Sequence, residues 1–360
     1  MTTKRNSTTH IRIGRKASAS PASPASPASP ASPASPASGA TTSTGRRRWL
    51  FGAAVLGVAT LTAVGALVAE GGAHAAVLTN CAATPANCGY PGATNTGVPS
   101  GTALKSVPGQ VSSGPGWSYN AAGKDVIVNV KGTVLSGLYI PHNLVIDAAN
   151  VTVKNVQVVT SGDFGISLTH TAGVTIENST ISGQNATTGR VSSAIDDVYG
   201  DSTGMVIKDN NISYFRTAIQ ISTGLADGNY IHNPGFIAGD HTNGFYVNGG
   251  TEPLTIENNT IFNSQWQTDA INLDAGSSGV PVANKTIENN LLAGGGYTIY
   301  GGTSPANPTS HIVIEGNRIG QQYYPLGGQY GPGAYFAPTG TGNVWSGNVW
   351  DTTGKAIPAP

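Results

Sequence analysis

Short segments with alternating apolar and polar residues recur along the chain from residue 126 onward. In Val174–Ile181, aliphatic residues stand at the first, third and last positions, with glutamate, asparagine and hydroxyl residues between them. Related copies lie at Met205–Ile212, Leu254–Ile261, Lys285–Leu292 and Ile312–Ile319. An alternation with a period of two predicts a β-strand that buries one face. The repeats therefore predict a series of short strands.

The central aliphatic residue of each copy serves as an anchor for spacing. The anchors are Val153, Ile176, Ile207, Ile256, Ile287, Ile314 and Val344. They are separated by 23, 31, 49, 31, 27 and 30 residues, and the longest gap contains a degenerate copy, Ala226–Ile231. Such periods indicate a solenoid whose rungs bury their apolar faces by stacking. With a further rung at Val126–Ile140, we expect eight or nine rungs and a column about 40 Å long.

Asparagines follow the anchors at two positions. Those at the second position are Asn155, Asn178, Asn258 and Asn289, and those at the third are Asn210, Asn229, Asn259, Asn290 and Asn317. Stacked rungs place equivalent amides one strand spacing apart, where they form a hydrogen-bonded ladder. Asparagine also tolerates the left-handed backbone of a sharp corner. We therefore expect an asparagine ladder and asparagine corners.

A second column of strands lies about eleven to thirteen residues before most anchors. Its members are Gly165–Leu168, Ala194–Asp197, Ala218–Ile221, Gly244–Val247, Ala270–Leu273 and Tyr297–Tyr300. Together with the asparagine repeat, this pattern resembles the right-handed parallel β-helix repeat of the pectate-lyase-like superfamily, over residues 126 to about 350. The segments Gly294–Tyr300 and Trp345–Trp350 also resemble a group of secreted bacterial β-helix proteins without a defined activity. The resemblance implies an all-β protein, a right-handed parallel β-helix.

The first 75 residues differ from the rest in composition. Residues 1–45 are basic and contain a Pro-Ala-Ser repeat, which predicts disorder. Residues 46–75 combine three arginines, an apolar run and Ala73–Ala75, the pattern of a cleaved export signal. The arginines resemble a twin-arginine signal, although Gly45 stands where Ser or Thr is usual. An uncleaved membrane anchor is the alternative, because about 20 apolar residues can span a bilayer.

The mature chain is expected to begin near Ala76 and to have three parts. Residues 76–124 predict an N-terminal arm, residues 125–350 the parallel β-helix and residues 351–360 a C-terminal tail. Cys81 and Cys88 are the two cysteines. In an exported protein, such a pair is expected to form a disulfide. The expected location is therefore secreted and extracellular.

The charge balance excludes one class of partner. Up to Ala75 there are eight Lys and Arg and one Glu, which leaves ten basic and seventeen acidic residues in the mature chain. A surplus of about seven negative charges argues against a nucleic-acid partner. We expect a monomer that binds a polysaccharide and, once the signal is removed, makes no membrane contact.

The resemblance places a substrate groove along the second column, because superfamily enzymes bind their substrates there. The outward positions of this column are Ser167, Asp196, Gln220, Tyr246, Asn272 and Tyr300, and Asp274 follows at the next outward position. The preceding turns bring Arg190, Arg216, Asp240, His241 and Asp269 to the same edge. We predict catalytic roles for Asp196, Asp197, Arg216, Asp240, His241, Asp269 and Asp274. We predict substrate contacts for Arg190, Gln220, Tyr246, Asn272 and Tyr300.

Several of these residues also have structural interpretations. Alternation would send Asp197 inward, so either the strand bulges and both aspartates face outward, or Asp197 is buried with a partner such as Arg190. His241 is either a proton shuttle or a turn cap, and Asp269 either a catalytic group or the start of a strand. The aromatic residues expected to stack on sugars or to cap the last rung are Tyr246, Trp266, Tyr297, Tyr300, Tyr323, Tyr324, Tyr330 and Tyr335. The glutamates Glu177, Glu257, Glu288 and Glu315 are expected to form a solvated stripe.

The leading functional hypothesis is a polysaccharide lyase. His241, Arg216 or a tyrosine would remove a proton beside a uronate carboxylate, which a Ca²⁺ ion on Asp196, Asp197 or Asp274 would neutralise. A glycoside hydrolase using an aspartate pair and a non-catalytic glycan-binding or surface protein are the alternatives. The Trp-x-Asp-His and Arg-x-Pro-x-x-Arg motifs of pectate lyases and the Gly-His-Gly and Arg-x-Lys motifs of polygalacturonases are absent from the chain. Neither family's catalytic residues can therefore be transferred.

Overall fold

The computed structural model describes residues 80–274 and 279–360, which belong to one compact unit. The expected disordered segment 1–45 and export signal 46–75 lie outside the described residues. Within the described part of the chain, no helix has the length and apolar character needed to cross a bilayer.

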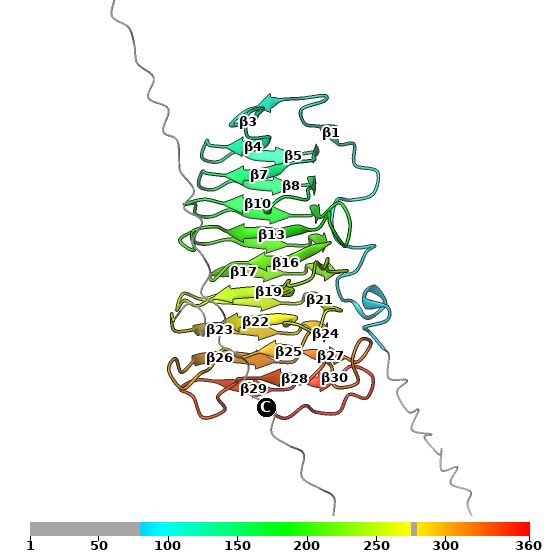
Figure 1. Ribbon diagram of the computed structural model, residues 1–360, viewed down its shortest axis with the longest axis vertical. Helices are drawn as coiled ribbons and strands as arrows, with labels where there is room; N and C mark the ends of the chain where they lie inside the picture. Colours follow the sequence, from blue (N-terminus) through cyan, green and yellow to red (C-terminus); the bar gives the residue numbers. More distant parts are fainter. Residues whose placement is uncertain (1–79, 275–278) are drawn as a thin grey trace, which may run out of the picture. The chain divides into compact units, whose positions relative to one another are not determined.

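The described chain forms three sheets, and in each sheet the strands of successive coils lie side by side (Figure 1). In spatial order, sheet A contains β1 (Lys105–Ser106), β6 (Leu138–Ile140), β9 (Gln157–Val159), β12 (Thr180–Ser182), β15 (Asn211–Ser213), β18 (Tyr230–His232), β21 (Thr260–Asn263), β24 (Leu291–Gly294), β27 (Arg318–Gly320) and β30 (Val349–Trp350). Sheet B contains β2 (Ser113–Gly114), β3 (Trp117–Asn120), β4 (Asp125–Val128), β7 (Asn143–Ile146), β10 (Phe164–Leu168), β13 (Val191–Asp197), β16 (Phe215–Gln220), β19 (Asn243–Asn248), β22 (Ile271–Asp274), β25 (Tyr297–Tyr300) and β28 (Gly331–Ala334). Sheet C contains β5 (Val134–Ser136), β8 (Thr152–Lys154), β11 (Thr175–Glu177), β14 (Val206–Lys208), β17 (Gly224–Asp227), β20 (Leu254–Glu257), β23 (Ala283–Glu288), β26 (Ser310–Glu315) and β29 (Val344–Ser346).

Each coil passes through sheets B, C and A in turn, so every strand of one coil pairs in parallel with its equivalent in the next. Ile176, for example, pairs with Val153 on one side and Ile207 on the other. Ala226 of the degenerate copy occupies the same column, between Ile207 and Ile256. The predicted parallel solenoid is confirmed. The expected eight or nine rungs are close to the observed number, since the shortest sheet has nine strands.

The last anchor was assigned one residue too early. Trp345, and not Val344, pairs with Ile314, and Val344 is 40% exposed. The error has a physical reason: in this rung the large apolar side chain at the anchor position is aromatic, and the aliphatic residue before it points outward.

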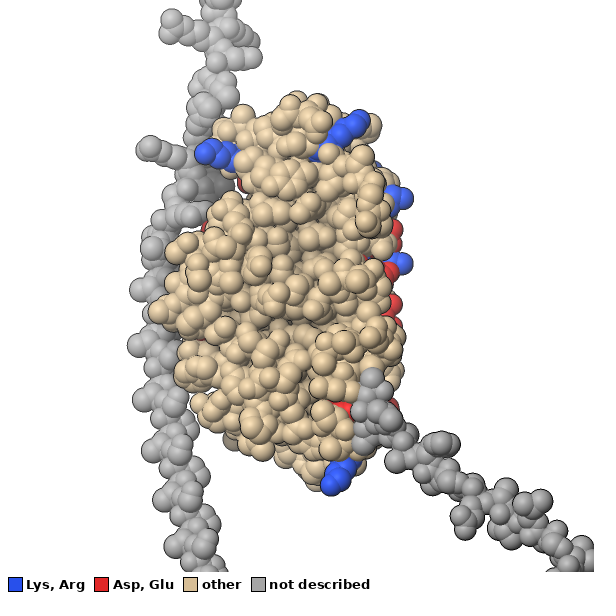
Figure 2. All heavy atoms as spheres, turned by 90° about the vertical axis from the view of Figure 1, so that its right-hand side faces the viewer, with Lys and Arg blue, Asp and Glu red and all other residues tan. Residues whose placement is uncertain are grey.

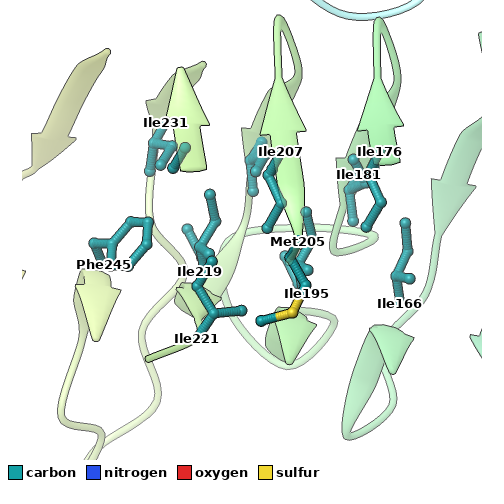
Figure 3. Close-up of a cluster of buried hydrophobic side chains, with 14 of the residues drawn as sticks. Ile166, Ile176, Ile181, Ile195, Met205, Ile207, Ile219, Ile221, Ile231 and Phe245 are labelled. Carbon is teal, nitrogen blue, oxygen red and sulfur yellow. The ribbon is translucent and has the colours of Figure 1, made fainter. Parts of the chain in front are cut away.

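The interior is a stack of aliphatic side chains from all three sheets. Ile176, Ile207 and Ile231 are fully buried, as are Ile195 and Ile219 of the facing sheet B. Figure 3 shows these side chains pointing toward one another across the coil. Burying an aliphatic side chain of this size contributes about 1.5–3 kcal/mol, so the stack is the main source of stability.

The predicted asparagine ladder is confirmed. Each third-position amide donates from Nδ2 to the Oδ1 of the next, at 2.9–3.0 Å along Asn210, Asn229, Asn259, Asn290 and Asn317. The ladder continues to Asn348, which the misplaced last anchor had concealed. These amides are almost completely buried, so replacing one asparagine would leave its neighbour in the ladder with an unsatisfied polar group.

The second-position asparagines have a different role. Asn155, Asn178, Asn258 and Asn289 have φ angles between 47° and 55°, the left-handed region. They form the corners between sheets C and A, as expected for a residue that tolerates this conformation. Two adjacent asparagines in one repeat thus serve a corner and a ladder.

The N-terminal arm runs beside sheet A. The predicted disulfide between Cys81 and Cys88 is confirmed, with a Cα–Cα distance of 5.6 Å, next to the short 3₁₀ helix η1 (Pro85–Cys88). The Ala82 amide donates to Asp351 in the last coil, the Gly97 amide donates to the Asp209 carbonyl in a middle coil, and β1 pairs with β6 in the first coil. The arm therefore spans the stack from its last coil to its first.

Candidate functional site

The outer face of sheet B carries the column that the sequence predicted. Ser167 pairs with Asp196, Asp196 with Gln220, and Gln220 with Tyr246. Tyr246 then pairs with Asn272, and Asn272 with Tyr300. Asp274 pairs with Asn248 at the next outward position. The predicted register is therefore confirmed at each of these strands.

Two adjoining depressions form a groove over strands β16 to β28. The first, of about 390 Å³, is lined by Arg216, Thr217, Gln220, His241, Asn243, Tyr246, Thr268, Asn272 and Asp274. The second, of about 370 Å³, is lined by His241, Gln267, Thr268, Asp269, Asn272, Asp274, Gly296, Tyr297, Tyr300, Tyr330 and Tyr335. They share His241, Thr268, Asn272 and Asp274, so they form one trough, hereafter the groove. Eight of the twelve predicted catalytic and substrate-contacting residues line it.

Asp269 is the most perturbed carboxyl group in the groove. It is only 5% exposed, and burial raises its pKa to about 7, with a smaller contribution from the nearby charge of Asp274. Its Oδ1 accepts a hydrogen bond from the Tyr297 amide at 3.1 Å and its Oδ2 accepts one from the Asn272 side chain at 3.0 Å. These bonds favour the ionised form, but the loss of solvation outweighs them.

The backbone around Asp269 is closely packed. Gly295, with φ 83°, forms an isolated bridge with Asp269, and a Cβ atom at Gly295 would lie 2.8 Å from the Asp269 Cα. Only glycine allows the next coil to approach this closely. Below, the buried Asn263 side chain donates to the Asp269 carbonyl at 3.1 Å. The carboxyl group is thus held at a fixed position and shielded from water.

Asp274 lies in a more open environment at the end of β22. The Tyr246 hydroxyl, from the neighbouring strand, donates to its Oδ2 at 2.8 Å. Asp274 is partly exposed, and a hydrogen bond to a carboxylate favours its ionised form. The groove therefore contains two carboxyl groups in different environments, one shielded and one solvated.

Arg216 lines the first depression only, whereas His241 lines both. The Nε of Arg216 is buried without a hydrogen-bond partner among the described residues, and its positive charge lowers the pKa of Asp196. The Oδ1 atoms of Asn243 and Asn272 are buried and unpartnered in the same way. Unpartnered buried groups of this kind are rare in folded proteins.

Four tyrosines form the other end of the groove. Tyr300 stacks on Tyr335 with ring centroids 4.5 Å apart, and Tyr297 lies 5.8 Å from Tyr330. Tyr330 and Tyr335 are 57% and 53% exposed. Burial raises the pKa of Tyr300, as do the charges of Asp269 and Asp274, so its hydroxyl stays protonated. Trp266, also considered as a sugar platform, is 54% exposed and does not line the groove.

Of the two alternatives for Asp196 and Asp197, the structure favours a buried Asp197, with Ser202 and not Arg190 as its partner. Both are buried, at 4% and 6% exposure. Burial raises the pKa of Asp196 to about 6, opposed by a hydrogen bond from Ser193 and by Arg216. Asp197 takes the register position of the buried Leu168, but its carboxylate accepts hydrogen bonds from the Ser202 amide and not from Arg190. Asp197 therefore stabilises the turn that follows β13.

The three aspartates considered for calcium do not come together. Asp196 on β13 and Asp274 on β22 are three strand spacings apart, about 14 Å, while calcium ligands lie about 2.4 Å from the ion. Asp197 faces the Ser202 turn. Across residues 80–274 and 279–360, no three His, Cys, Asp or Glu side chains are grouped to hold a metal. The residues present do not fit the expected site.

Arg190 and Asp240 satisfy each other outside the groove. The guanidinium donates to both carboxylate oxygens of Asp240 at 2.5 Å, and Asp240 also accepts the Ile237 amide. Both side chains are nearly buried. This pair joins the loop before β13 to the loop before β19, so its evident role is to fix the wall beside Arg216.

Some residues were missed at the sequence level. Asn243 and Thr217 line the groove just upstream of the outward column. A period of two from the buried Phe245 and Ile219 assigns both to the inward face, so alternation alone does not identify them. Lys285 occupies an inward anchor-minus-two position where the other copies have aliphatic residues, and this departure was a visible signal. It is fully buried, and its Nζ donates to the Ser222 and Glu252 carbonyls.

The charged residues of sheet C form a column of their own. Pairing aligns Lys154, Glu177, Lys208, Asp227, Glu257, Glu288 and Glu315. Figure 2 shows charged side chains gathered along one edge of the described body, while most of the face in view is uncharged. Lys208 and Glu177 form an ion pair at 3.4 Å.

A search of curated proteins found no match to the chain. In a comparison with protein families, residues 136–319 match the right-handed β-helix region. The match covers slightly more than half of the chain and includes the strands that carry Asp196, Gln220, Tyr246, Asn272 and Tyr300. The parallel stack and this match agree, and the chain belongs to the right-handed β-helix family.

Proposed function

We propose that this protein hydrolyses a glycan bound in the groove of sheet B, with Asp269 as the general acid. The observation that carries the proposal is the pair of unlike carboxyl groups: Asp269 is shielded, with its pKa raised to about 7, and Asp274 is partly exposed and hydrogen-bonded to Tyr246. Glycoside hydrolysis requires this combination of a protonated acid and an ionised carboxylate.

The two carboxyl groups have separate tasks. Protonated Asp269 donates its proton to the glycosidic oxygen, and the departing sugar leaves as an alcohol. Asp274 lies on the other side of the scissile bond, where its carboxylate accepts a proton from the water molecule that attacks the anomeric carbon. The Tyr246 hydroxyl donates to Asp274 and positions it.

The tyrosine end of the groove supports a sugar ligand. Tyr300 and Tyr335 form a rigid stacked pair, and Tyr330 adds a further exposed ring. Aromatic faces bind the apolar faces of sugar rings, and the polar side chains of Asn243 and Asn272 line the same groove.

The test is an incubation with neutral polymers (xylan, arabinan, galactan and mannan) and acidic ones (polygalacturonate and alginate). New reducing ends without absorbance at 235 nm, lost in Asp269→Asn, are the expected result. A full panel without cleavage by the wild-type protein would overturn the proposal, and retention of a polysaccharide without cleavage would indicate a binding protein.

β-Elimination is the second candidate, favoured by Arg216. Its guanidinium lies in the groove with a buried, unpartnered Nε, near His241. Arg216 would neutralise a uronate carboxylate, and His241 would remove the adjacent proton. Absorbance rising at 235 nm on polygalacturonate or alginate, and abolished in Arg216→Ala, would establish this reaction in place of hydrolysis.

Export is part of the proposal, because the structural polysaccharides of the panel lie outside cells. The disulfide between Cys81 and Cys88 supports an oxidising location. Recovery of the protein from the culture medium, with an N-terminus near Ala76, is the expected result of expressing the full chain.

A further inference from the structure

A third hollow lies beside the groove at the other edge of sheet B. It has a volume of about 320 Å³, and its lining includes Asp197, Tyr199, Gln220, Ser222 and Asn248. Gln220 also lines the groove, so the two spaces adjoin at this side chain. A chain-like ligand in the groove can therefore continue past Gln220 into this hollow.

Tyr199 presents an exposed aromatic face at this hollow. It is 61% exposed, the largest exposed fraction among the described large hydrophobic residues. Its ring stacks on His170 with centroids 4.2 Å apart and planes 12° from parallel. His170 is in turn fixed by Asp201, whose Oδ2 lies 2.6 Å from the His170 Nδ1. The tyrosine is thus held in place by contacts on one face only.

Folding does not require this arrangement. Tyr199 lies in the turn after β13 and does not belong to the apolar core, so its second face remains open to solvent. A rigid aromatic ring beside polar side chains is the usual form of a sugar-stacking position. Asp197, Gln220, Ser222 and Asn248 supply acceptors and donors for sugar hydroxyl groups.

We propose that Tyr199 and this hollow form a distal subsite that binds a sugar unit of the same glycan far from the cleaved bond. This inference rests on the proposed function of the groove. The coil of Tyr199 is three strand spacings, about 14 Å, from the coil of Asp269. A ligand that reaches both must be a polymer of several sugar units. The protein is therefore expected to cleave within long chains in preference to short oligosaccharides.

The test compares chain lengths with the polysaccharide that the panel identifies. Tyr199→Ala should lower kcat/KM about tenfold on the long polymer and leave the rate on a trisaccharide unchanged, because only the long chain reaches the subsite. Tyr199→Phe, which keeps the ring, is the matched control and should behave like the wild-type protein. His170→Ala, which removes the supporting ring, should give an intermediate loss on the polymer alone.

An equal loss on both chain lengths, or no loss on either, would overturn the subsite. A binding measurement separates this result from failure of the hydrolase proposal. Asp269→Asn and the double variant Asp269→Asn with Tyr199→Ala are titrated with the same polymer, and equal affinities would overturn the subsite even if the wild-type protein cleaves nothing. A protein that binds no polymer of the panel would overturn both proposals.

Discussion

Sheets B and C both stack polar side chains outward, one from each coil, yet only the face of sheet B is built as a site. On sheet C, Glu257, Glu288 and Glu315 follow one another at the strand spacing, and no pocket is found over them among the described residues. On sheet B, Tyr246, Asn272 and Tyr300 follow one another in the same way, but loops on either side form walls.

The difference lies in solvation. Asp269 is 5% exposed and its pKa is raised to about 7, whereas Glu315 is exposed. A repeating fold aligns side chains on every face, so alignment by itself does not create chemistry. The loops before β19, β22 and β28 line the groove over one aligned set, and no pocket is found over the other in the described part of the chain. Removal of water is the largest cause of the raised pKa of Asp269.

The strongest contrast between the two faces is expected in catalysis. Asp269→Asn removes the transferable proton, and we expect kcat/KM on the cleaved polysaccharide to fall about 10³-fold. Glu288→Gln, the same chemical change on sheet C, should alter kcat/KM by less than about twofold. Measurement of both variants by release of reducing ends checks the contrast, and comparable losses would contradict it.

The free energy of unfolding should depend on pH because of the titration of Asp269. Its pKa is about 7 in the folded protein and near 4 in an unfolded chain. Between pH 4 and 7 the unfolded chain releases this proton while the folded protein keeps it, so folding loses stability as the pH rises and no more is lost above 7. The total is about 4 kcal/mol.

Asp269→Asn lacks this dependence. Its free energy of unfolding relative to the wild-type protein should therefore rise by about 4 kcal/mol from pH 4 to pH 8 in denaturant titrations. Glu288→Gln serves as the control and should show a change of less than about 1 kcal/mol. An unchanged difference between Asp269→Asn and wild type at the two pH values would show that Asp269 is ionised in the folded protein.

A smaller effect is expected at Tyr246. Tyr246→Phe keeps the ring but removes the hydroxyl that donates to Asp274, a hydrogen bond worth about 1.5 kcal/mol. We expect kcat/KM to fall about tenfold with the affinity for the polysaccharide nearly unchanged. Steady-state kinetics of Tyr246→Phe, together with polysaccharide binding by Tyr246→Phe in the Asp269→Asn background, distinguish this outcome from loss of a sugar contact. In that case KM would rise and kcat would stay constant.

The smallest effect belongs to the exposed ion pair of sheet C. Lys208→Met removes the partner of Glu177, whose side chain is 23% exposed beside a lysine that is 39% exposed. Because solvent screens such pairs, the free energy of unfolding should change by less than about 0.5 kcal/mol. A loss above about 1.5 kcal/mol in urea denaturation would show that the sheet C column stabilises the fold.

The sequence predicted the fold more fully than the site, for reasons visible in single residues. Ile176 and Asn210 recur with a fixed spacing, so their pairing partners follow from counting. Tyr246, Asn272 and Tyr300 follow from the same count, because the outward positions share the register. Five of the eight predicted residues in the groove, the four on the outward column and Asp274, meet there for this reason.

The parts that escaped prediction depend on loops and on side-chain direction. Arg190 and Asp240 lie on loops of unequal length, and no period shows that they pair with each other. Asp197 lies in a regular strand, but its carboxylate turns to the Ser202 amide in the following loop. The calcium hypothesis named Asp196, Asp197 or Asp274 by residue type, and three strand spacings separate Asp196 from Asp274. The strand register predicts where a residue lies along the stack, but it does not predict which contacts the loops make.

The central claim, that the walls of sheet B keep Asp269 protonated near neutral pH, can be measured directly. Infrared difference spectra between the wild-type protein and Asp269→Asn, recorded from pH 4 to pH 9, isolate the carboxyl stretch of this residue. A protonated carboxyl band that disappears with a midpoint near pH 7 is the expected result. A band that is already lost below pH 5 would contradict the account.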